Sequence, residues 1–471
     1  MLFNSYDFIF LFLPIVLILF YLLVPKKFKL LFLLFSSYFF YGYWNYKFIP
    51  LLIFSTFLDF FIGNKLASEQ SQKKRKILLY FSILSNLGLL AFFKYYNFSA
   101  ESINFITNQL LGTALFRTYE IVLPVGISFY TFQSMSYTID LYRKKSKAYN
   151  NFFAFAAYVS LFPQLIAGPI IRHSDLVTQL EESTRKKFSS SFFARGIYLF
   201  VLGLSKKVLI ADRLSAGIDP VIAQISTATT LEAWACALGY TFQLYFDFSG
   251  YSDMAIGIGL MLGLKFPQNF NSPYKSYSIT DFWRRWHITL SAWLRDYLYI
   301  SLGGNQQGKS RTYINLMITM LLGGLWHGAA WTYVIWGGFH GALLSIERIL
   351  GADQKPTSKI SYLFRAIFTF LLVVIGWVIF RSENYDLAST WLNKMFSLNG
   401  GLKLSHFSAS TRDRFAGALL ISMIISWATE NNTILLNSLT RPRTKAIYCA
   451  TLLFFVVLYL GGHSPFLYFQ F

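Results

Sequence analysis

The sequence YDFIFLFLPIVLILFYLLV, residues 6–24, carries one acidic side chain and no basic one, and PKKFK, residues 25–29, follows it directly. A helix of this length is about 28 Å long, close to the thickness of the hydrocarbon core of a bilayer. The stretch lacks the basic n-region and the small-residue cleavage site of a signal peptide. It therefore predicts a retained membrane-spanning helix, and helices of this kind decide the fold.

The composition extends this pattern to the whole chain. Of the 471 residues, 55% are hydrophobic and 14% are charged, whereas about a quarter of the residues in soluble globular proteins are charged. Apolar blocks continue to residue 460 and supply about ten or eleven crossings. The composition argues against a soluble enzyme and excludes a disordered chain, a coiled coil and collagen. It predicts an all-α polytopic membrane protein with a single membrane domain over residues 1–471.

The basic residues show how the chain is oriented. The chain has 42 Lys and Arg against 22 Asp and Glu, a net charge of +20, and the bases cluster at residues 26–29, 73–76, 143–147 and 441–445, between apolar blocks. Such links stay on the cytoplasmic side and meet anionic lipid. We therefore expect the N-terminus outside, membrane lipid as a partner and no nucleic acid.

Simple alternation of crossings accounts for the first third of the chain. It predicts helices over residues 30–46, 48–63, 77–95 and 121–141, with residues 96–120 in an external loop. The next apolar stretch, residues 152–167, meets Gly168, Pro169 and then bases, which favours a broken or re-entrant segment. Polar interruptions continue from residue 191 to 350, so the number of crossings there stays open. Ordinary spans are predicted again at residues 362–380, 415–427 and 446–460.

His327 lies in the apolar stretch LLGGLWHGAAW, residues 321–331. Ionisable side chains inside a membrane are rare and costly. A buried imidazole stays neutral more readily than a carboxylate, so His327 is a candidate to accept a proton from a hydroxyl group near pH 7. Trp326 is a candidate substrate-binding residue beside it, and the glycines allow a substrate chain to approach closely. The alternative is a packed histidine whose ring bonds to a backbone carbonyl.

A second candidate region is TDFWRRWHITLSAWLR, residues 280–295. Its aromatic and aliphatic side chains recur at helical spacing, and His287 and the arginines fall on another stripe, which predicts one amphipathic helix. If this helix lines a polar cavity, Trp283, Arg284 and Arg285 contact an anionic ligand, because arginine holds phosphate groups well. The alternative is an interfacial anchor made of tryptophan and arginine.

The other histidines carry less weight. On one continuous helix, His340 would lie about 20 Å from His327 and on another side of the axis, so we interpret it as structural. We expect three histidines in loop-like sequence to be solvated or interfacial: His173, His406 and His463.

Two acids in an apolar setting, Asp247 and Asp253, are either functional or tie a helix that is broken at residues 249–250. The hydroxyl and amide groups over residues 123–133 suit a polar cavity wall or bonds between helices. Cys236 and Cys449 stand alone, and no metal-ligand spacing, serine-hydrolase elbow or P-loop occurs. We therefore expect no metal and no bound cofactor.

Five stretches carry a resemblance to a known family: residues 123–142, 161–172, 244–263, 281–304 and 323–341. The motifs DFWRRWH at 281–287 and GGLWHG at 323–328 are specific. On these residues the chain resembles the membrane-bound O-acyltransferase (MBOAT) family, within it the branch that contains the alginate O-acetyltransferase membrane subunit. The resemblance covers essentially the whole chain.

The resemblance implies a bundle of roughly ten to twelve transmembrane helices, with re-entrant or interfacial helices, around a central funnel in the bacterial cytoplasmic (inner) membrane. An acyl group, most simply acetyl, would pass from a cytoplasmic thioester such as acetyl-CoA to an acceptor on the other side. His327 would be the general base or a transient acyl carrier, and His287 would orient the donor carbonyl or line the channel. Arg284 and Arg285 would lie near the donor phosphates.

The same resemblance implies a periplasmic or extracellular SGNH-type acetyltransferase as partner and an exported polysaccharide, such as alginate, as final acceptor. Two alternatives stay open at this point. One is D-alanyl transfer to teichoic acid, within the same family. The other is a non-enzymatic polysaccharide transporter or scaffold, which would keep its function without His327.

Overall fold

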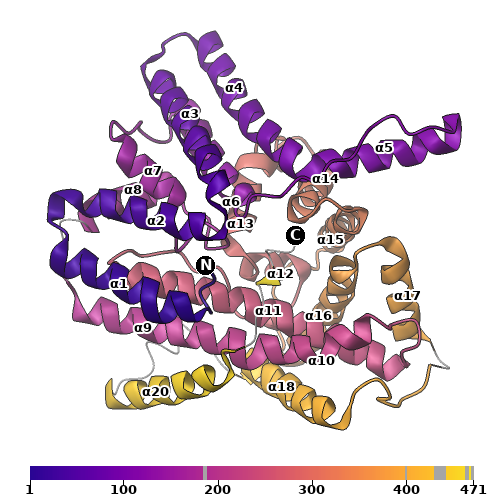
Figure 1. Cartoon of the computed structure of the whole chain (residues 1–471). Helices are drawn as coiled ribbons and strands as arrows, with labels where there is room; N and C mark the ends of the chain where they lie inside the picture. The colour runs from indigo at the N-terminus through magenta and orange to yellow at the C-terminus, as the bar shows by residue number, and fades with distance from the viewer. Residues whose placement is uncertain (184–187, 398–399, 429–441, 462–465, 468–471) are drawn as a thin grey trace. The chain divides into compact units, whose positions relative to one another are not determined.

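The structure is a computed structural model that describes residues 1–183, 188–397, 400–428, 442–461 and 466–467 (Figure 1). Every regular element among these residues is a helix. The all-α class predicted from the sequence is therefore confirmed for the described part of the chain.

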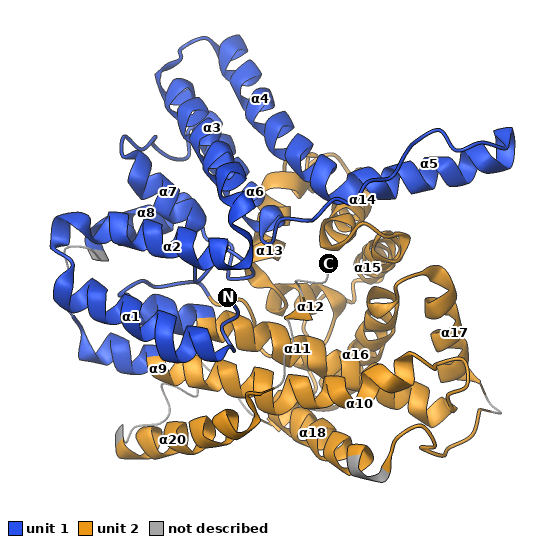
Figure 2. Cartoon of the chain, viewed as in Figure 1, with its two compact units in different colours: residues 1–196, 255–267 blue, residues 197–254, 268–471 orange. Residues whose placement is uncertain are grey.

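The chain divides into two compact units (Figure 2). Unit 1 consists of residues 1–196 and 255–267, and unit 2 of residues 197–254 and 268–471. Two helices belong in part to each unit, α9 (Ser190–Ser205) and α11 (Thr230–Met261). The single membrane domain expected from the sequence stays a prediction.

Unit 1 begins with three consecutive helical segments, of which the first and last are π-helical: η1 (Asp7–Phe12), α1 (Leu13–Ile18) and η2 (Leu19–Leu23). Its other helices are α2 (Lys29–Asn45), α3 (Ile49–Ser68), α4 (Gln72–Leu90) with the π-helical η5 (Ala91–Tyr95), α5 (Tyr96–Leu111), α6 (Ile127–Tyr142), α7 (Phe152–Ser160) and α8 (His173–Ser183). Short 3-10 turns at Lys26–Phe28 and Tyr46–Phe48 join the first helices.

Most predicted helices of unit 1 are confirmed, whereas one predicted helix begins later than expected and one predicted loop is largely helical. The helix expected at residues 121–141 begins only at Ile127, because Pro124 lacks an N–H group and Gly126 has a φ of +77°. The loop expected at residues 96–120 is wrong in part, since α5 occupies its first sixteen residues. Asn97 and Asn104 on α5 hold the returning segment by accepting and donating hydrogen bonds with its backbone.

The break expected after residues 152–167 is also present. α7 already ends at Ser160, and an irregular segment follows to residue 172. Three helical stretches of the described residues are long and apolar enough to cross a membrane: Lys26–Ser68, Gln72–Leu111 and Lys359–Arg381. Asp7–Leu23 is a shorter apolar helix. The larger number of crossings stays a prediction.

Unit 2 contains the C-terminal part of α9 and most of α11, followed by the remaining helices. These are η6 (Lys206–Ala211), α10 (Asp212–Ile222), η7 (Pro273–Lys275), α12 (Ile279–Arg285), α13 (Ile288–Trp293), η8 (Leu294–Tyr299), α14 (Lys309–His327), α15 (Trp331–Ile349), α16 (Lys359–Arg381), α17 (Tyr385–Phe396), α18 (Ala409–Ala428) and α20 (Pro442–Tyr459).

The helix break expected at residues 249–250 is wrong, because α11 is continuous over 32 residues. Gly250 allows close packing instead of a break. A Cβ on Gly250 would lie 2.7 Å from the carbonyl oxygen of Gly203 on α9, within unit 2. The glycine therefore brings two helices together.

The two acids of α11 are held in ion pairs. Nζ of Lys207 lies 2.7 Å from Oδ1 of Asp247, and Nζ of Lys206 lies 2.7 Å from Oδ2 of Asp253. The backbone N–H of Leu467 also donates to Asp247, at 2.9 Å. Buried charges need such partners, so the structure favours the structural interpretation of both acids.

Candidate active site

The hairpin of α14 and α15 positions the first candidate histidine. The two helices pack so closely that a Cβ on Gly324 would collide with the carbonyl oxygen of Tyr333, and one on Gly337 with that of Met320. Residues 328–330 form the short link between the helices. The chain therefore reverses directly after His327, the last residue of α14.

The hairpin brings His327 and His340 to the same side chain. The ring centroid of Trp336 lies 5.2 Å from that of His327 and 5.0 Å from that of His340. Both histidines are buried. The continuous helix assumed for this pair from the sequence is therefore wrong, and His340 belongs to the surroundings of His327.

The amphipathic helix predicted at residues 280–295 is broken at His287. α12 ends at Arg285, α13 begins at Ile288, and His287 adopts a left-handed conformation with a φ of +41°. Such backbone is rare for a residue with a side chain and occurs often at functional sites. Asn269 supports the break, because its backbone oxygen accepts the N–H of Ile288 at 2.9 Å.

The ring of His287 is fully buried and held by the same asparagine. Nδ1 of His287 lies 3.1 Å from Oδ1 of Asn269. Because this oxygen is an acceptor, Nδ1 donates and Nε2 carries the lone pair. His287 lies outside the helices that are long enough to span a membrane. Burial lowers the pKa of its imidazole to about 3. The ring is therefore neutral at pH 7, as a proton acceptor or hydrogen-bonding group requires.

Trp326 connects the two predicted site histidines. Its ring centroid lies 6.3 Å from that of His287 and 5.0 Å from that of His327. The two imidazoles thus flank one indole, although they come from motifs forty residues apart in the sequence.

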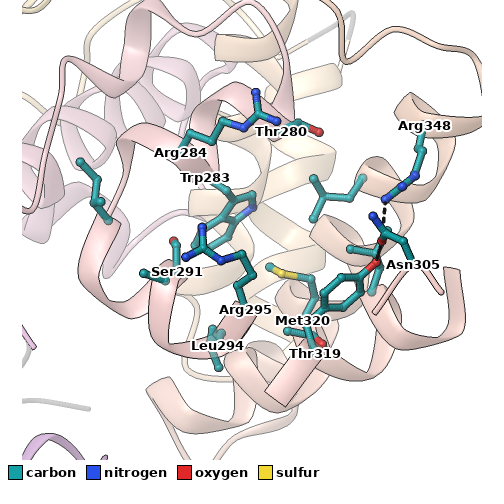
Figure 3. A pocket seen from close by; sticks show the side chains of 15 residues that line it. Thr280, Trp283, Arg284, Ser291, Leu294, Arg295, Asn305, Thr319, Met320 and Arg348 are labelled. Carbon is teal, nitrogen blue, oxygen red and sulfur yellow. Dashed lines mark hydrogen bonds between the residues drawn. The ribbon is translucent and has the colours of Figure 1, made fainter. Parts of the chain in front are cut away.

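A cavity of about 430 Å³ lies next to this cluster, within unit 2. Figure 3 shows Arg284, Arg295 and Arg348 reaching it from different helices. Trp283, Leu294 and Met320 provide apolar lining. Three guanidinium groups beside an apolar wall suit a ligand that carries phosphate groups at one end and an apolar chain at the other.

The three arginines differ in their partners. Arg295 donates twice to Asp296, and Arg348 approaches Oδ1 of Asn305 at 3.4 Å. Within the described residues, Arg284 has no ion-pair partner. Arg285 is not among the lining residues, and its Nε donates to Asp281 at 2.9 Å.

Trp283 leads from the cavity toward His327. Its ring centroid lies 5.7 Å from that of Trp336, which in turn contacts His327. Among the described residues, Nε1 of Trp283, Nε1 of Trp336 and both ring nitrogens of His340 are buried without a hydrogen-bond partner. Buried polar groups are rarely left unsatisfied, and of these side chains Trp283 lines the cavity. His340 is the site residue that the sequence interpretation missed.

Glu347 anchors α12, which carries Trp283 and Arg284. Its carboxylate accepts the backbone N–H groups of Ile279 and Thr280, at 2.6 and 2.8 Å, and the hydroxyl of Thr280 at 2.7 Å. A carboxylate at the first turn of a helix is favourable because the N–H groups there have no partner within the helix. Glu347 on α15 thus positions the wall of the cavity.

We expect Glu347→Gln to loosen this wall. The amide would present an NH2 group to a backbone N–H and leave a donor unsatisfied, which costs about 2 kcal/mol of stability. A thermal unfolding curve of the purified protein measures this cost, and Asp353→Asn on the following turn is the matched control. Equal melting temperatures for Glu347→Gln and the wild type would contradict the anchoring role.

The remaining candidates lie elsewhere. The expectation that His173 is solvated or interfacial is wrong. The side chain is buried among Tyr137, Tyr149 and Tyr158 in unit 1. His406 is partly exposed, and its Nδ1 lies 2.8 Å from Oε2 of Glu232. His463 lies outside the described residues.

Two expectations concern metals and cysteines. Among the described residues, no group of three or more histidine, cysteine or acidic side chains could hold a metal ion. Both cysteines are free thiols.

The polar side chains of α6, from Ser128 to Thr138, are buried within unit 1.

Comparison with known proteins places these motifs in one family. The family model described as MBOAT, membrane-bound O-acyltransferase family, matches residues 144–382. This range contains both GGLWHG and DFWRRWH, and therefore all six site residues predicted from the sequence.

Several curated proteins are similar over most of the chain. The probable alginate O-acetylase AlgI of Pseudomonas putida is 44% identical, with 100% of both chains covered. The protein of the same name from Pseudomonas aeruginosa is 48% identical over 90% of this chain and 80% of its own. The peptidoglycan O-acetyltransferase of Helicobacter pylori is 36% identical, with 100% of this chain and 98% of its own covered.

Proposed function

Since the chain belongs to the membrane-bound O-acyltransferase family, we propose that it moves an acetyl group from a cytoplasmic thioester across the membrane for the O-acetylation of an exported or cell-surface polysaccharide. The relatives named as alginate O-acetylase and peptidoglycan O-acetyltransferase share acetyl transfer to a polymer that contains sugars. The alginate O-acetylases are more similar to this chain than the peptidoglycan O-acetyltransferase is, which favours an alginate-like polysaccharide as the final acceptor.

The cavity is the observation that carries the donor side of the proposal. Acetyl-CoA has phosphate groups at one end and a thioester at the other, joined by a long flexible arm. Arg284 and Arg348 would hold the phosphates, and the arm would extend along Trp283 toward Trp336 and His327. The protein itself then supplies orientation and exclusion of water.

His327 acts as the general base on the acceptor hydroxyl. Counted from the cavity, the order of contacts is Trp283, Trp336 and His327. The thioester carbon would arrive along the tryptophans from the arginines, and the acceptor would meet it at His327. The hydroxyl oxygen attacks this carbon and its proton passes to the imidazole, so that an ester bond forms as the carbon–sulfur bond breaks. The leaving thiolate of CoA then takes this proton from the imidazolium, which restores neutral His327. His287, fixed by Asn269, orients the donor carbonyl or lines its path.

The cavity faces the cytoplasm in this proposal. Arg348 lies near the end of α15, and the following turn into α16 carries Lys355 and Lys359. Basic turns of this kind stay cytoplasmic. The protein is then a multi-pass protein of the bacterial inner membrane that hands the acetyl group to a periplasmic or extracellular SGNH-type partner, which esterifies the polymer.

Radiolabelled acetyl-CoA tests the donor site directly. We expect Arg284→Gln to raise the KM for acetyl-CoA about tenfold in vesicles that contain the purified protein, because one charge-assisted contact to phosphate is lost. The kcat should change little, since the arginine lies far from the reacting carbon.

Arg311→Gln is the matched control. It also removes one arginine from unit 2, from an exposed position on α14 that does not line the cavity. An equal rise in KM for both variants would mean that the arginines act only through net charge. An unchanged KM for Arg284→Gln would exclude the cavity as the donor site.

A further inference from the structure

A second pocket lies in unit 1, and none of its lining residues belongs to the candidate active site. It has a volume of about 350 Å³ and is formed where α3 ends, α4 begins and the chain leaves α6. Its charged lining consists of Arg75, Lys144, Lys147 and one acid, Glu69. The lining therefore carries an excess of two positive charges.

Arg75 builds the pocket. Its side chain is buried and donates to the carbonyl oxygens of Leu66, Leu141 and Tyr142, so it joins the ends of α3 and α6 to the start of α4. These bonds fix the guanidinium group in place. The pocket is thus a formed feature of the fold and not a gap between mobile loops.

Two buried polar atoms at the pocket have no hydrogen-bond partner within the described part of the chain. Among the described residues, neither Nε of Arg75 nor Oγ of Ser146 has a hydrogen-bond partner. A donor on a cationic group and a hydroxyl beside two lysines are suited to the oxygens of a phosphate. The Oε1 atom of Glu69, by contrast, already accepts the N–H of Ser71, at 2.8 Å.

The surface next to the pocket indicates where the phosphate comes from. α3 and α4 lie side by side (Figure 2) and expose large apolar side chains: Phe57, Phe61, Ile77, Tyr80 and Leu84. Exposed apolar surface on candidate membrane spans faces lipid chains. A phosphate in the pocket would therefore lie at the end of a surface that lipid chains cover.

Aromatic rings and lysines mark the depth of the pocket in the membrane. Nζ of Lys65 lies 4.9 Å from the ring centroid of Phe61, and Nζ of Lys76 lies 5.6 Å from that of Tyr80. Aromatic and basic side chains of this kind gather at the boundary between hydrocarbon and headgroups. The pocket lies beyond both pairs along α3 and α4, at the level of the headgroups.

We propose that this pocket binds the phosphate of an anionic glycerophospholipid, with Lys144, Lys147 and Ser146 around the phosphate and the acyl chains along α3 and α4. The site is independent of the acyl transfer proposed above. It differs from general attraction of a basic loop to lipid because it holds one headgroup in a defined place.

Native mass spectrometry of the full chain tests the site. The protein is purified in phosphatidylcholine nanodiscs that contain a few per cent of phosphatidylglycerol, and retained phosphatidylglycerol is counted. We expect the double variant Lys144→Gln, Lys147→Gln to retain it at least tenfold more weakly, since two charge-assisted contacts are lost. Ser146→Ala, which leaves the charge unchanged, should weaken retention by a smaller factor.

The double variant Lys26→Gln, Lys27→Gln is the matched control, because it removes two exposed lysines from another basic turn of unit 1 that does not line this pocket. Retention close to wild type in this control supports the proposal. Equal loss in both double variants would overturn it in favour of diffuse attraction. Displacement of the lipid by millimolar inorganic phosphate would also overturn it, since the source would then be a soluble phosphate.

Discussion

His327→Ala is expected to abolish O-acetylation of the exported polymer while the polymer itself continues to be secreted. A general base contributes about 10² to 10⁴ in rate, so ester content should fall below one hundredth of the wild-type level. The measurement is the ester content of the secreted polysaccharide, together with the amount of protein in the membrane. Matched protein levels are required, because His327 is also buried between Trp326, Trp336 and Phe380.

His327→Gln separates chemistry from packing. Glutamine fills a similar volume and forms hydrogen bonds, but it cannot take a proton near pH 7. Loss of esters in both variants supports the role of His327 as base. Esters at the wild-type level with glutamine would show a packing role, and loss of the polymer itself would favour a transporter or scaffold.

Gly337→Ala is expected to prevent normal folding of the hairpin. The added methyl group would collide with the carbonyl oxygen of Met320, and neither backbone can move without separating α14 from α15. Overpacking of this kind costs about 3 kcal/mol. Because His327 ends α14, the displacement also reaches the candidate active site. The fraction of monodisperse protein after heating in detergent measures the effect.

The neighbouring glycine is the control for this prediction. A Cβ on Gly338 would meet only Cδ2 of Leu321, at 3.5 Å, which is an ordinary contact. Gly338→Ala should therefore be neutral or stabilise α15 by about 0.5 kcal/mol, since alanine favours helix. Equal destabilisation by both substitutions would show that the close approach of the helices is not the cause.

The helical class and most early spans could be predicted because apolar runs of membrane length leave few other structures for the backbone. The family could be predicted from two local motifs. The break at His287 could not, because residues 280–295 keep helical spacing on both sides of it. The backbone there is held by Asn269, whose carbonyl oxygen accepts the N–H of Ile288, and such a contact leaves no periodic signal.

The sequence places His340 far from His327 for a similar reason. The turn between α14 and α15 contains Gly328 and two alanines, and alanine is the strongest helix former. What allows the turn is the close approach of the two helices at Gly324 and Gly337, which are distant from it in the sequence. The burial of His173 likewise leaves no local signal, because the tyrosines that bury it, Tyr137 among them, come from other segments.

The hydrogen bond from Leu467 to Asp247 joins residues 220 positions apart. A ribosome that adds about 5 to 20 residues per second needs roughly 10 to 40 s to cover this distance. Phe466 is synthesised directly before Leu467, and its ring stacks on that of Tyr251 with the ring centroids 4.7 Å apart. Phe466 also contacts Phe248, whose ring contacts His287. The wall next to this histidine is therefore completed late in biosynthesis. A translation product that stops before residue 466 therefore lacks this wall of the candidate active site.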